Sequence, residues 1–288
     1  MAELLDTFPA FEAFWKASQY APLDVQIARW AGEYLAPWPE LLDKQVADYA
    51  ESDLDWRQVA AERVFPNMAK RLPAMCEARR NLSELCIPVY ARAQKALDFD
   101  SPAVFVLYVG LECGAGWVTT FHDTPAILFG LEAIAECGWS DANLISGLVA
   151  HEIGHLAHHY WRAQHEKPLG DGPWWQLYEE GFAQRCDCLI METHIPHEAR
   201  ADGEWLPWCR AHRAWLAARF LETIDASEPV MPFFGSWFEI EGKRQTGYFL
   251  GGEAIQELEK HFGLKEIALL DDVETWLRPI LEQWAEAE

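Results

Sequence analysis

A single cluster of strand-like segments interrupts two long stretches of helical pattern, and this arrangement constrains the fold most. Residues 103–109 (Ala-Val-Phe-Val-Leu-Tyr-Val) form a β-branched and aromatic run of strand length, and residues 117–121 and 126–130 are two further short runs. Before and after the cluster, apolar residues recur at three and four positions, as on one face of a helix. The sequence therefore predicts an α+β fold with a small mixed sheet.

We expect the 288 residues to form one domain, because no Gly/Ser-rich linker and no internal repeat divides them. Pro37, Pro39, Pro66 and Pro73 are expected to separate the N-terminal helices. Ser140 is the expected N-cap of the first helix after the sheet. The predicted parts are a helical layer over about 1–98, a sheet with helices at about 140–164 and 174–191, and a helical part over about 191–288 with helices near 205–224 and after Gly247.

The composition is that of an acidic globular protein. Half of the residues are hydrophobic, and 15 Trp with 15 Phe supply large surfaces for a core. The sequence contains 23 Lys and Arg and 46 Asp and Glu, and the resulting formal charge of -23 repels polyanions. We therefore expect no nucleic acid and no membrane as a partner. The charge indicates either a solvated acidic surface or a preference for basic substrates.

The termini and the cysteines favour a cytoplasmic protein. The first residues lack the basic and apolar regions of a secretory signal, and the longest apolar stretch, at about 103–111, is too short to span a bilayer. Seven cysteines form an odd set without the regular spacing of a disulfide scaffold, so we expect reduced thiols. Cys186 and Cys188 point to different sides of a helix and are interpreted as structural rather than as a metal pair.

A motif with metal-binding spacing lies in the helix expected at 140–164. His151-Glu152-Ile153-Gly154-His155 has the pattern H-E-x-x-H. Residues four apart lie on one helix face about 6 Å apart along the axis, so His151 and His155 can converge on one ion with Glu152 beside them. The alternative is an amphipathic helix with two hydrogen-bonded histidines.

A third ligand is expected, because a catalytic zinc usually takes three protein ligands and leaves one position open. The extended pattern H-E-x-x-H-x-x-G-x-x-H fails, since its last Gly and His positions hold His158 and Trp161. His158 lies too far along the axis from His151 to share its metal. His158 and His159 are interpreted as a solvated or hydrogen-bonded helix surface, with a place on the rim of the site as the alternative.

The segment Glu180-Gly181-Phe182-Ala183 resembles the corresponding segment of the gluzincin metallopeptidases, including predicted bacterial zinc-dependent proteases. The resemblance covers about residues 126–191. It implies a zincin-like fold in which Glu180 is the third zinc ligand, with one Zn²⁺ per chain. Small residues at Gly181 and Ala183 would let the second helix approach the first. Glu179, the rival ligand, is interpreted as a surface charge or as an outer partner.

Two further features are compared with the same family. Many gluzincins place an aspartate four residues after the ligand glutamate, whereas this chain has Gln184 there and Asp187 beyond it, so the partner of the ligating imidazoles is left open. Residues 125–130 lie where the family places the edge strand that binds substrate, and an ordinary buried strand is the alternative.

The oxyanion donor is assigned to Tyr248, in a glycine-flanked entry to a C-terminal helix that resembles a Gly-Tyr segment of predicted bacterial zinc-dependent proteases. A tyrosine packed as the anchor of that helix is the alternative, and His122 is a further candidate donor.

The resulting hypothesis is a zinc-dependent peptidase that uses metal-activated water, with Glu152 as general base and a peptide or protein as substrate. One alternative is a catalytically silent protein with a structural metal. A di-iron carboxylate bundle is a second, but it needs two Glu-x-x-His pairs and only Glu152 to His155 fits. Substrate sequence, endo- or exopeptidase action and oligomeric state stay open.

Overall fold

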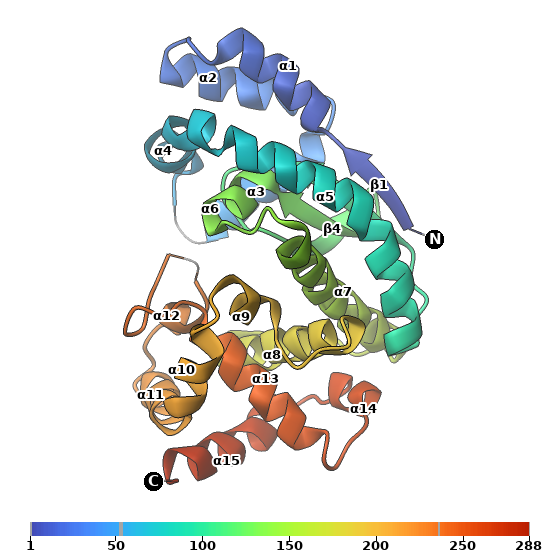
Figure 1. Ribbon diagram of the computed structural model, residues 1–288, viewed down its shortest axis with the longest axis vertical. Coiled ribbons are helices and arrows are strands. Elements are labelled where there is room, and N and C mark those ends of the chain that lie inside the picture. Colours follow the sequence, from blue (N-terminus) through green and yellow to red (C-terminus); the bar gives the residue numbers. More distant parts are fainter. Residues whose placement is uncertain (1, 52–53, 236, 288) are drawn as a thin grey trace. The chain divides into compact units, whose positions relative to one another are not determined.

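The chain adopts an α+β fold, as predicted, that is mainly helical with a small mixed sheet (Figure 1). The computed structural model describes residues 2–51, 54–235 and 237–287. Contacts divide the chain into two compact units, residues 1–89 with 102–149 and residues 90–101 with 150–288. The single-domain organisation stays a prediction.

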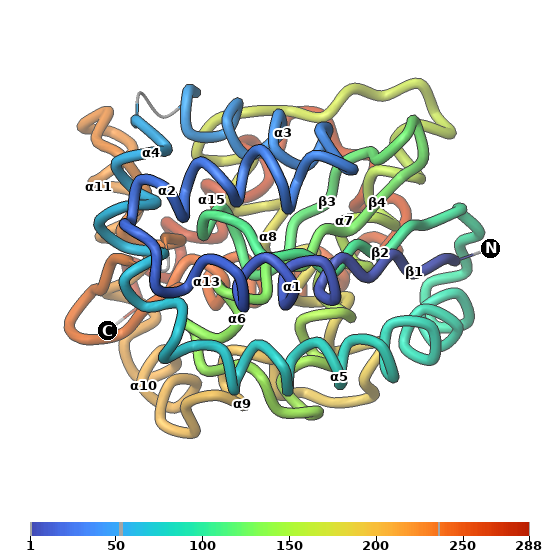
Figure 2. The backbone as a smooth tube through the Cα atoms, turned by 90° about the horizontal axis from the view of Figure 1, so that it is seen from above, coloured from blue at the N-terminus to red at the C-terminus, as the bar shows by residue number. Residues whose placement is uncertain are grey.

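The first unit contains a sheet of four strands in the order β1-β2-β4-β3 (Figure 2). Strands β1 and β4 pair with β2 in parallel, and β3 pairs with β4 antiparallel. The three strands predicted after residue 100 are present. The strand bounds are Ala2–Asp6 (β1), Ala103–Tyr108 (β2), Trp117–Phe121 (β3) and Thr124–Gly130 (β4).

The N-terminal layer is mostly helical, as expected, but Ala2–Asp6 adds β1 to the sheet in register with β2, Ala2 opposite Ala103. One expectation for the sheet is wrong. The segment 125–130 is not an edge strand, because β4 bonds to β2 on one side and to β3 on the other. Ile127, Leu128 and Phe129 are fully buried, so the alternative of an interior strand is correct.

Helix α5 (Phe65–Leu97) corrects the expected role of the prolines. Pro73 lies inside this one helix instead of ending a shorter one. A proline costs one backbone hydrogen bond, but α5 buries Met68, Met75 and Leu82 completely along its face. The other helices of this unit are α1 (Phe8–Ser18), α2 (Leu23–Arg29), the π-helical turn η1 (Trp30–Tyr34), α3 (Pro39–Glu51), α4 (Trp56–Val59), the π-helical turn η2 (Ala60–Val64) and α6 (Leu131–Cys137).

A buried chain of ion pairs lies beside the sheet of this unit. The Glu132 carboxylate is fully buried and accepts the backbone N–H groups of Gly110 at 2.7 Å and Glu112 at 2.9 Å. The guanidinium of Arg71 binds the carboxylates of Glu112 and Glu136. Each carboxylate thus has a donor within the unit.

The second unit is helical. It contains the end of α5, from Tyr90, and α7 (Ala142–Gln164) from Ala150 onward. The N-cap of α7 differs from the prediction: Asp141 Oδ1 accepts the N–H groups of Asn143 and Leu144, whereas the Ser140 hydroxyl binds Glu77. The further helices are α8 (Gly172–Ile190), α9 (His197–Ala201), α10 (Trp205–Ala211), α11 (Arg213–Asp225), α12 (Met231–Phe234), α13 (Thr246–Leu258), α14 (Leu264–Ala268) and α15 (Val273–Ala285).

Arg162, near the end of α7, fastens this helix to the C-terminal part of the second unit. Its guanidinium is buried and donates to the carbonyl oxygens of Pro168 at 2.8 Å, Ala268 at 3.0 Å and Leu270 at 2.8 Å. The bonds to Ala268 and Leu270 satisfy carbonyls at and just after the end of α14. The face of α7 that carries the H-E-x-x-H motif is therefore held in a fixed orientation within the unit. Among the described residues, no helix has both the length and the apolar character needed to cross a bilayer.

Candidate metal centre

The predicted ligand atoms converge in the second unit. His151 Nε2 lies 3.2 Å from His155 Nε2 and 3.2 Å from Glu180 Oε2, and His155 Nε2 lies 3.3 Å from the same oxygen. The two histidines come from successive turns of α7 and the glutamate from α8, as the spacing predicts. Together they form one of the groups in the described chain that could hold a metal ion.

These distances fit a tetrahedral zinc ion. With metal–ligand bonds of about 2.0–2.1 Å, two ligand atoms of a tetrahedron are about 3.3 Å apart. The three measured separations of 3.2, 3.2 and 3.3 Å match this edge. Without a metal, both imidazoles can donate an Nε2 proton to the Glu180 oxygen between them, and a bound cation would take the place of these protons. The role of the three residues as ligands stays a prediction.

The close approach of α7 and α8 has a different cause from the predicted one. Gly154, inside the motif, faces α8, where a methyl group would come within 2.8 Å of Cys186 Cβ and 2.9 Å of Ala183 Cα. Gly181 faces α13 instead, where a methyl group would lie 2.2 Å from the carbonyl carbon of Gly251. Ala183 therefore does contribute to the α7–α8 contact, as expected, but the glycine that permits this contact is Gly154.

Glu152 is buried beside the converging ligands. Burial raises the pKa of its carboxyl to about 7, a value suited to a group that takes and returns a proton near neutral pH. Burial alone would also raise the pKa of Glu180, but the neighbouring His155 imidazole lowers it to about 2. The two carboxyl groups thus differ in ionisation because of their surroundings, which fits a base and a ligand respectively.

Tyr248 reaches the same place from the first turn of α13. Its ring centroid is 5.7 Å from that of His151 and 5.9 Å from that of Phe234. The contact with Phe234 agrees with the alternative of a packing anchor, while the contact with His151 places the ring at the site. The further candidate donor, His122, lies in the turn between β3 and β4, and its exposed ring faces Glu40, with Nδ1 3.4 Å from Oε2.

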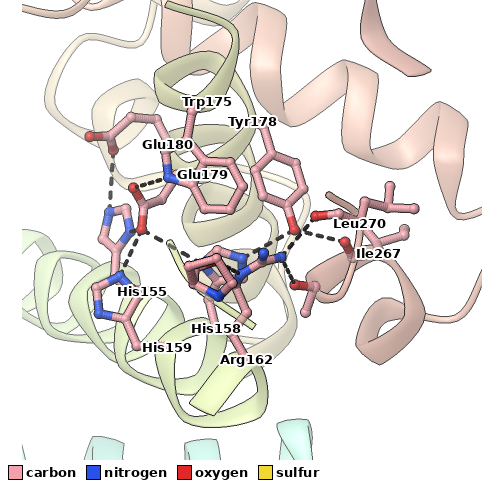
Figure 3. Close-up of polar contacts among 12 residues, drawn as sticks. His155, His158, His159, Arg162, Trp175, Tyr178, Glu179, Glu180, Ile267 and Leu270 are labelled. Carbon is pink, nitrogen blue, oxygen red and sulfur yellow. Dashed lines mark hydrogen bonds and ion pairs between the residues drawn. The ribbon is translucent and has the colours of Figure 1, made fainter. Parts of the chain in front are cut away.

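Glu179, the rival ligand, lies beside the ligands rather than among them (Figure 3). Its Oε1 is 2.7 Å from His159 Nε2 and 4.0 Å from His155 Nδ1, and its Oε2 accepts the Trp175 indole N–H at 3.1 Å. Glu179 is thus a part-buried carboxylate that bonds to His159 and Trp175 and lies 4.0 Å from His155, and it is not a solvated surface charge.

His158 is not a solvated residue. Its ring is fully buried, and Nε2 bonds at 3.1 Å to the hydroxyl of Tyr178, which in turn donates to the carbonyl of Ile267 at 2.7 Å (Figure 3). Burial lowers the pKa of His158 to about 4, so the ring is neutral at pH 7. His159 is partly exposed and pairs with Glu179, which is compatible with the rim.

The sequence reasoning missed His197 and Glu198, which the short helix α9 brings to His151. The ring centroids of His151 and His197 are 5.0 Å apart, and the three residues form a buried group with ligand atoms within 4.8 Å of one another. Asp187 and Gln184 of α8 hold this segment. The one available signal was Gln184, which stands where many gluzincins have an aspartate, with Asp187 three residues beyond it. This difference indicated that the partner of a ligating imidazole lies elsewhere in the chain, but it did not identify the residue.

Comparisons with known proteins add no relative: no protein-family model matches the chain, and no curated protein and no solved structure shows a significant match.

Proposed function

We propose that this chain is a zinc-dependent peptidase of the gluzincin type, with a zincin-like arrangement around one Zn²⁺ held by His151, His155 and Glu180. The observation that carries the proposal is the convergence of Nε2, Nε2 and Oε2 at tetrahedral separations of 3.2, 3.2 and 3.3 Å. Two histidines and one carboxylate are the ligand set of a catalytic rather than a closed structural zinc site.

The bound ion supplies Lewis acidity, which activates water and polarises the carbonyl of the scissile bond. The chain's own residues supply the proton transfers and the orientation. Glu152, buried next to the ligands, takes a proton from the attacking water and returns it to the leaving amine. The hydroxyl of Tyr248 donates to the oxyanion that develops on the substrate carbonyl.

The first test is the zinc content per chain by elemental analysis, on the wild type beside His155→Ala and Glu180→Ala. We expect one zinc in the wild type and a sharp reduction in both variants. His197→Ala serves as a control, because that residue belongs to the neighbouring group. Full zinc in Glu180→Ala, or two zinc ions per chain in the wild type, would contradict the assignment.

The second test concerns the chemistry. Glu152→Gln keeps the shape of the side chain but removes the base, so we expect it to retain zinc and lose about 10²- to 10⁴-fold in the hydrolysis of a fluorescence-quenched peptide library. A variant with full zinc and a full hydrolytic rate would show that Glu152 is not the base. Wild-type zinc protein that cleaves no library peptide would instead favour the structural-metal alternative.

A further inference from the structure

The imidazole of His151 has one nitrogen in the metal centre and one that the centre does not use. Its Nε2 faces His155 and Glu180, whereas its Nδ1 is buried and forms no hydrogen bond to any residue of the described chain. When Nε2 binds a metal, the proton of the neutral ring is on Nδ1. A buried N–H without an acceptor is costly, and metal-ligating imidazoles usually donate this proton to a carboxylate, a carbonyl or a water.

Glu198 is the carboxylate beside His151 that has a free acceptor. It is buried, and one of its oxygens lies within 4.8 Å of a ring nitrogen of His151. Its Oε2 accepts the Gln184 amide N–H at 3.0 Å, while its Oε1 accepts no hydrogen bond within the described chain, although His197 Nε2 is 3.4 Å away. A small rotation or one bridging water would close the remaining gap to the imidazole.

Helix α8 holds Glu198 in this place through two side chains. Gln184, one turn after Glu180, donates to the carboxylate, and Asp187, nearly one turn further on, accepts the backbone N–H of His197 at 2.9 Å and binds Arg200 at 3.0 Å. The helix that carries the third ligand therefore also fixes the segment that carries Glu198. The amide of Gln184 is uncharged and cannot itself act as a carboxylate acceptor, but it positions the carboxylate of Glu198.

Glu152 is the proposed general base, and the remaining carboxylates of the centre are already engaged. Glu180 faces both Nε2 atoms, and Glu179 lies beside His155 with bonds to His159 and Trp175. In the group of His151, His197 and Glu198, His197 Nε2 lies 3.4 Å from Glu198 Oε1, whereas all three ligand separations in the first group are 3.2 to 3.3 Å.

We propose that Glu198 is the positioning residue of His151, accepting the Nδ1 proton and fixing the ring so that Nε2 points at the metal. Gln184 supports this role by donating a hydrogen bond to Glu198. Together the two residues would take the place of the single aspartate that many gluzincins have at the position of Gln184. The inference rests on the proposed zinc site, but it concerns the affinity of that site and not the reaction.

The test is the zinc dissociation constant, measured by chelator competition on Glu198→Gln. The variant keeps the size of the side chain and its bond to Gln184, but it lacks a full carboxylate, so we expect zinc to bind about 10- to 100-fold more weakly. Glu253→Gln, which also removes one negative charge from a partly buried residue of the second unit, is the matched control and should keep the wild-type constant. An unchanged constant in Glu198→Gln would overturn the proposal.

Two further measurements separate positioning from a merely structural role. In the zinc-loaded wild type, ¹⁵N-edited NMR of the imidazoles should show His151 protonated at Nδ1, and Glu198→Gln should shift this resonance while the melting midpoint of the metal-free protein changes little. Gln184→Leu, which frees Glu198 from its support, should weaken zinc binding less than Glu198→Gln and provides the test if that variant does not fold. A folded Gln184→Leu with wild-type affinity and an unshifted His151 resonance would contradict the inference.

The failure of the zinc site and the failure of this inference give different results. Wild-type protein without zinc refutes the proposed function. If the wild type binds one zinc that is lost in His197→Ala but kept in Glu180→Ala, the ion lies in the group of His151, His197 and Glu198. Glu198 would then be a ligand, and the positioning role would be refuted.

Discussion

Each of the two units contains a cluster of buried ionisable side chains, and the two clusters differ in what balances their charge. In the first unit, Arg71 lies between Glu112 and Glu136, and Glu132 accepts two backbone N–H groups. In the second unit, the cluster of His151, His155 and Glu180 contains no arginine or lysine among its described contacts, and only the imidazoles can balance the charge of Glu180.

The difference teaches how to distinguish a structural cluster from a binding site. Burial and shifted pKa values occur in both, so neither property alone indicates function. The first cluster is closed, because the protein itself provides the donors that its carboxylates need. The second is open, because its atoms are placed at the separations that a metal ion would require and no arginine or lysine among its described contacts balances the carboxylate.

The largest expected effect tests whether the first cluster is closed. Arg71→Leu leaves the carboxylate of Glu112, which is 3% exposed, with only the Arg63 guanidinium at 4.0 Å. Removing one partner of a buried ion pair typically costs about 3–5 kcal/mol of unfolding free energy. Urea unfolding should show this loss. Glu136→Gln, at the exposed end of the same chain of ion pairs, should cost less than about 1 kcal/mol. Equal effects of the two variants would mean that the cluster does not depend on its buried pair.

The sequence predicted the parts of the second cluster that depend on local spacing. His151, Glu152 and His155 lie on one helix, and their convergence follows from its period. The position of Glu180 followed from a four-residue resemblance and from the small residues beside it, of which Ala183 does contact α7 while Gly181 faces α13. The bounds of α7 and α8 agree with the prediction to within about two residues.

The parts that escaped prediction depend on contacts between distant segments. Strand β1 exists because it pairs with β2, about a hundred residues away, and nothing in Ala2–Asp6 alone specifies that pairing. Glu198 reaches His151 because Asp187 and Gln184 bind the five-residue helix α9, and no periodic sequence pattern predicts so short a segment. Pro73 is tolerated inside α5 because the packing of the helix outweighs a local preference.

An intermediate effect concerns the pH dependence of the first cluster. Burial raises the pKa of Glu132 to about 7, above its ordinary value of 4.5. The folded state therefore binds this proton more tightly than the unfolded state, so the stabilisation is complete below about pH 4.5 and is lost as the pH rises through about 7. The loss is on the order of 3 kcal/mol.

Urea unfolding between pH 4.5 and 8 measures this loss. Glu132→Gln has no proton to release there, so its stability should fall less steeply over this range than that of the wild type. Glu84→Gln, at an exposed position of α5, is the control and should follow the wild-type curve. Parallel curves for the wild type and Glu132→Gln would show that the backbone N–H groups of Gly110 and Glu112 keep the carboxylate ionised in the fold.

The smallest expected effect sharpens the comparison at the second cluster, because it changes a spacing and no charge. In Gly154→Ala the added methyl group would lie 2.8 Å from Cys186 Cβ and 2.9 Å from Ala183 Cα, so α7 and α8 must move apart by several tenths of an ångström. That movement disturbs the separations of 3.2 and 3.3 Å between Glu180 and the two imidazoles. We expect zinc to bind roughly tenfold more weakly, about 1.4 kcal/mol, as measured by chelator competition.

The control is Gly203→Ala, whose methyl group would meet open space in the same unit. It should leave zinc affinity unchanged. A closed cluster tolerates such a shift, since hydrogen bonds and ion pairs stretch and water can fill in, whereas a tetrahedral ion needs its ligands within a few tenths of an ångström. If Gly154→Ala bound zinc as tightly as the wild type, the matched separations in the second cluster would reflect only the hydrogen bonding of two histidines and a glutamate. The second cluster could then not be distinguished from a closed one by its geometry.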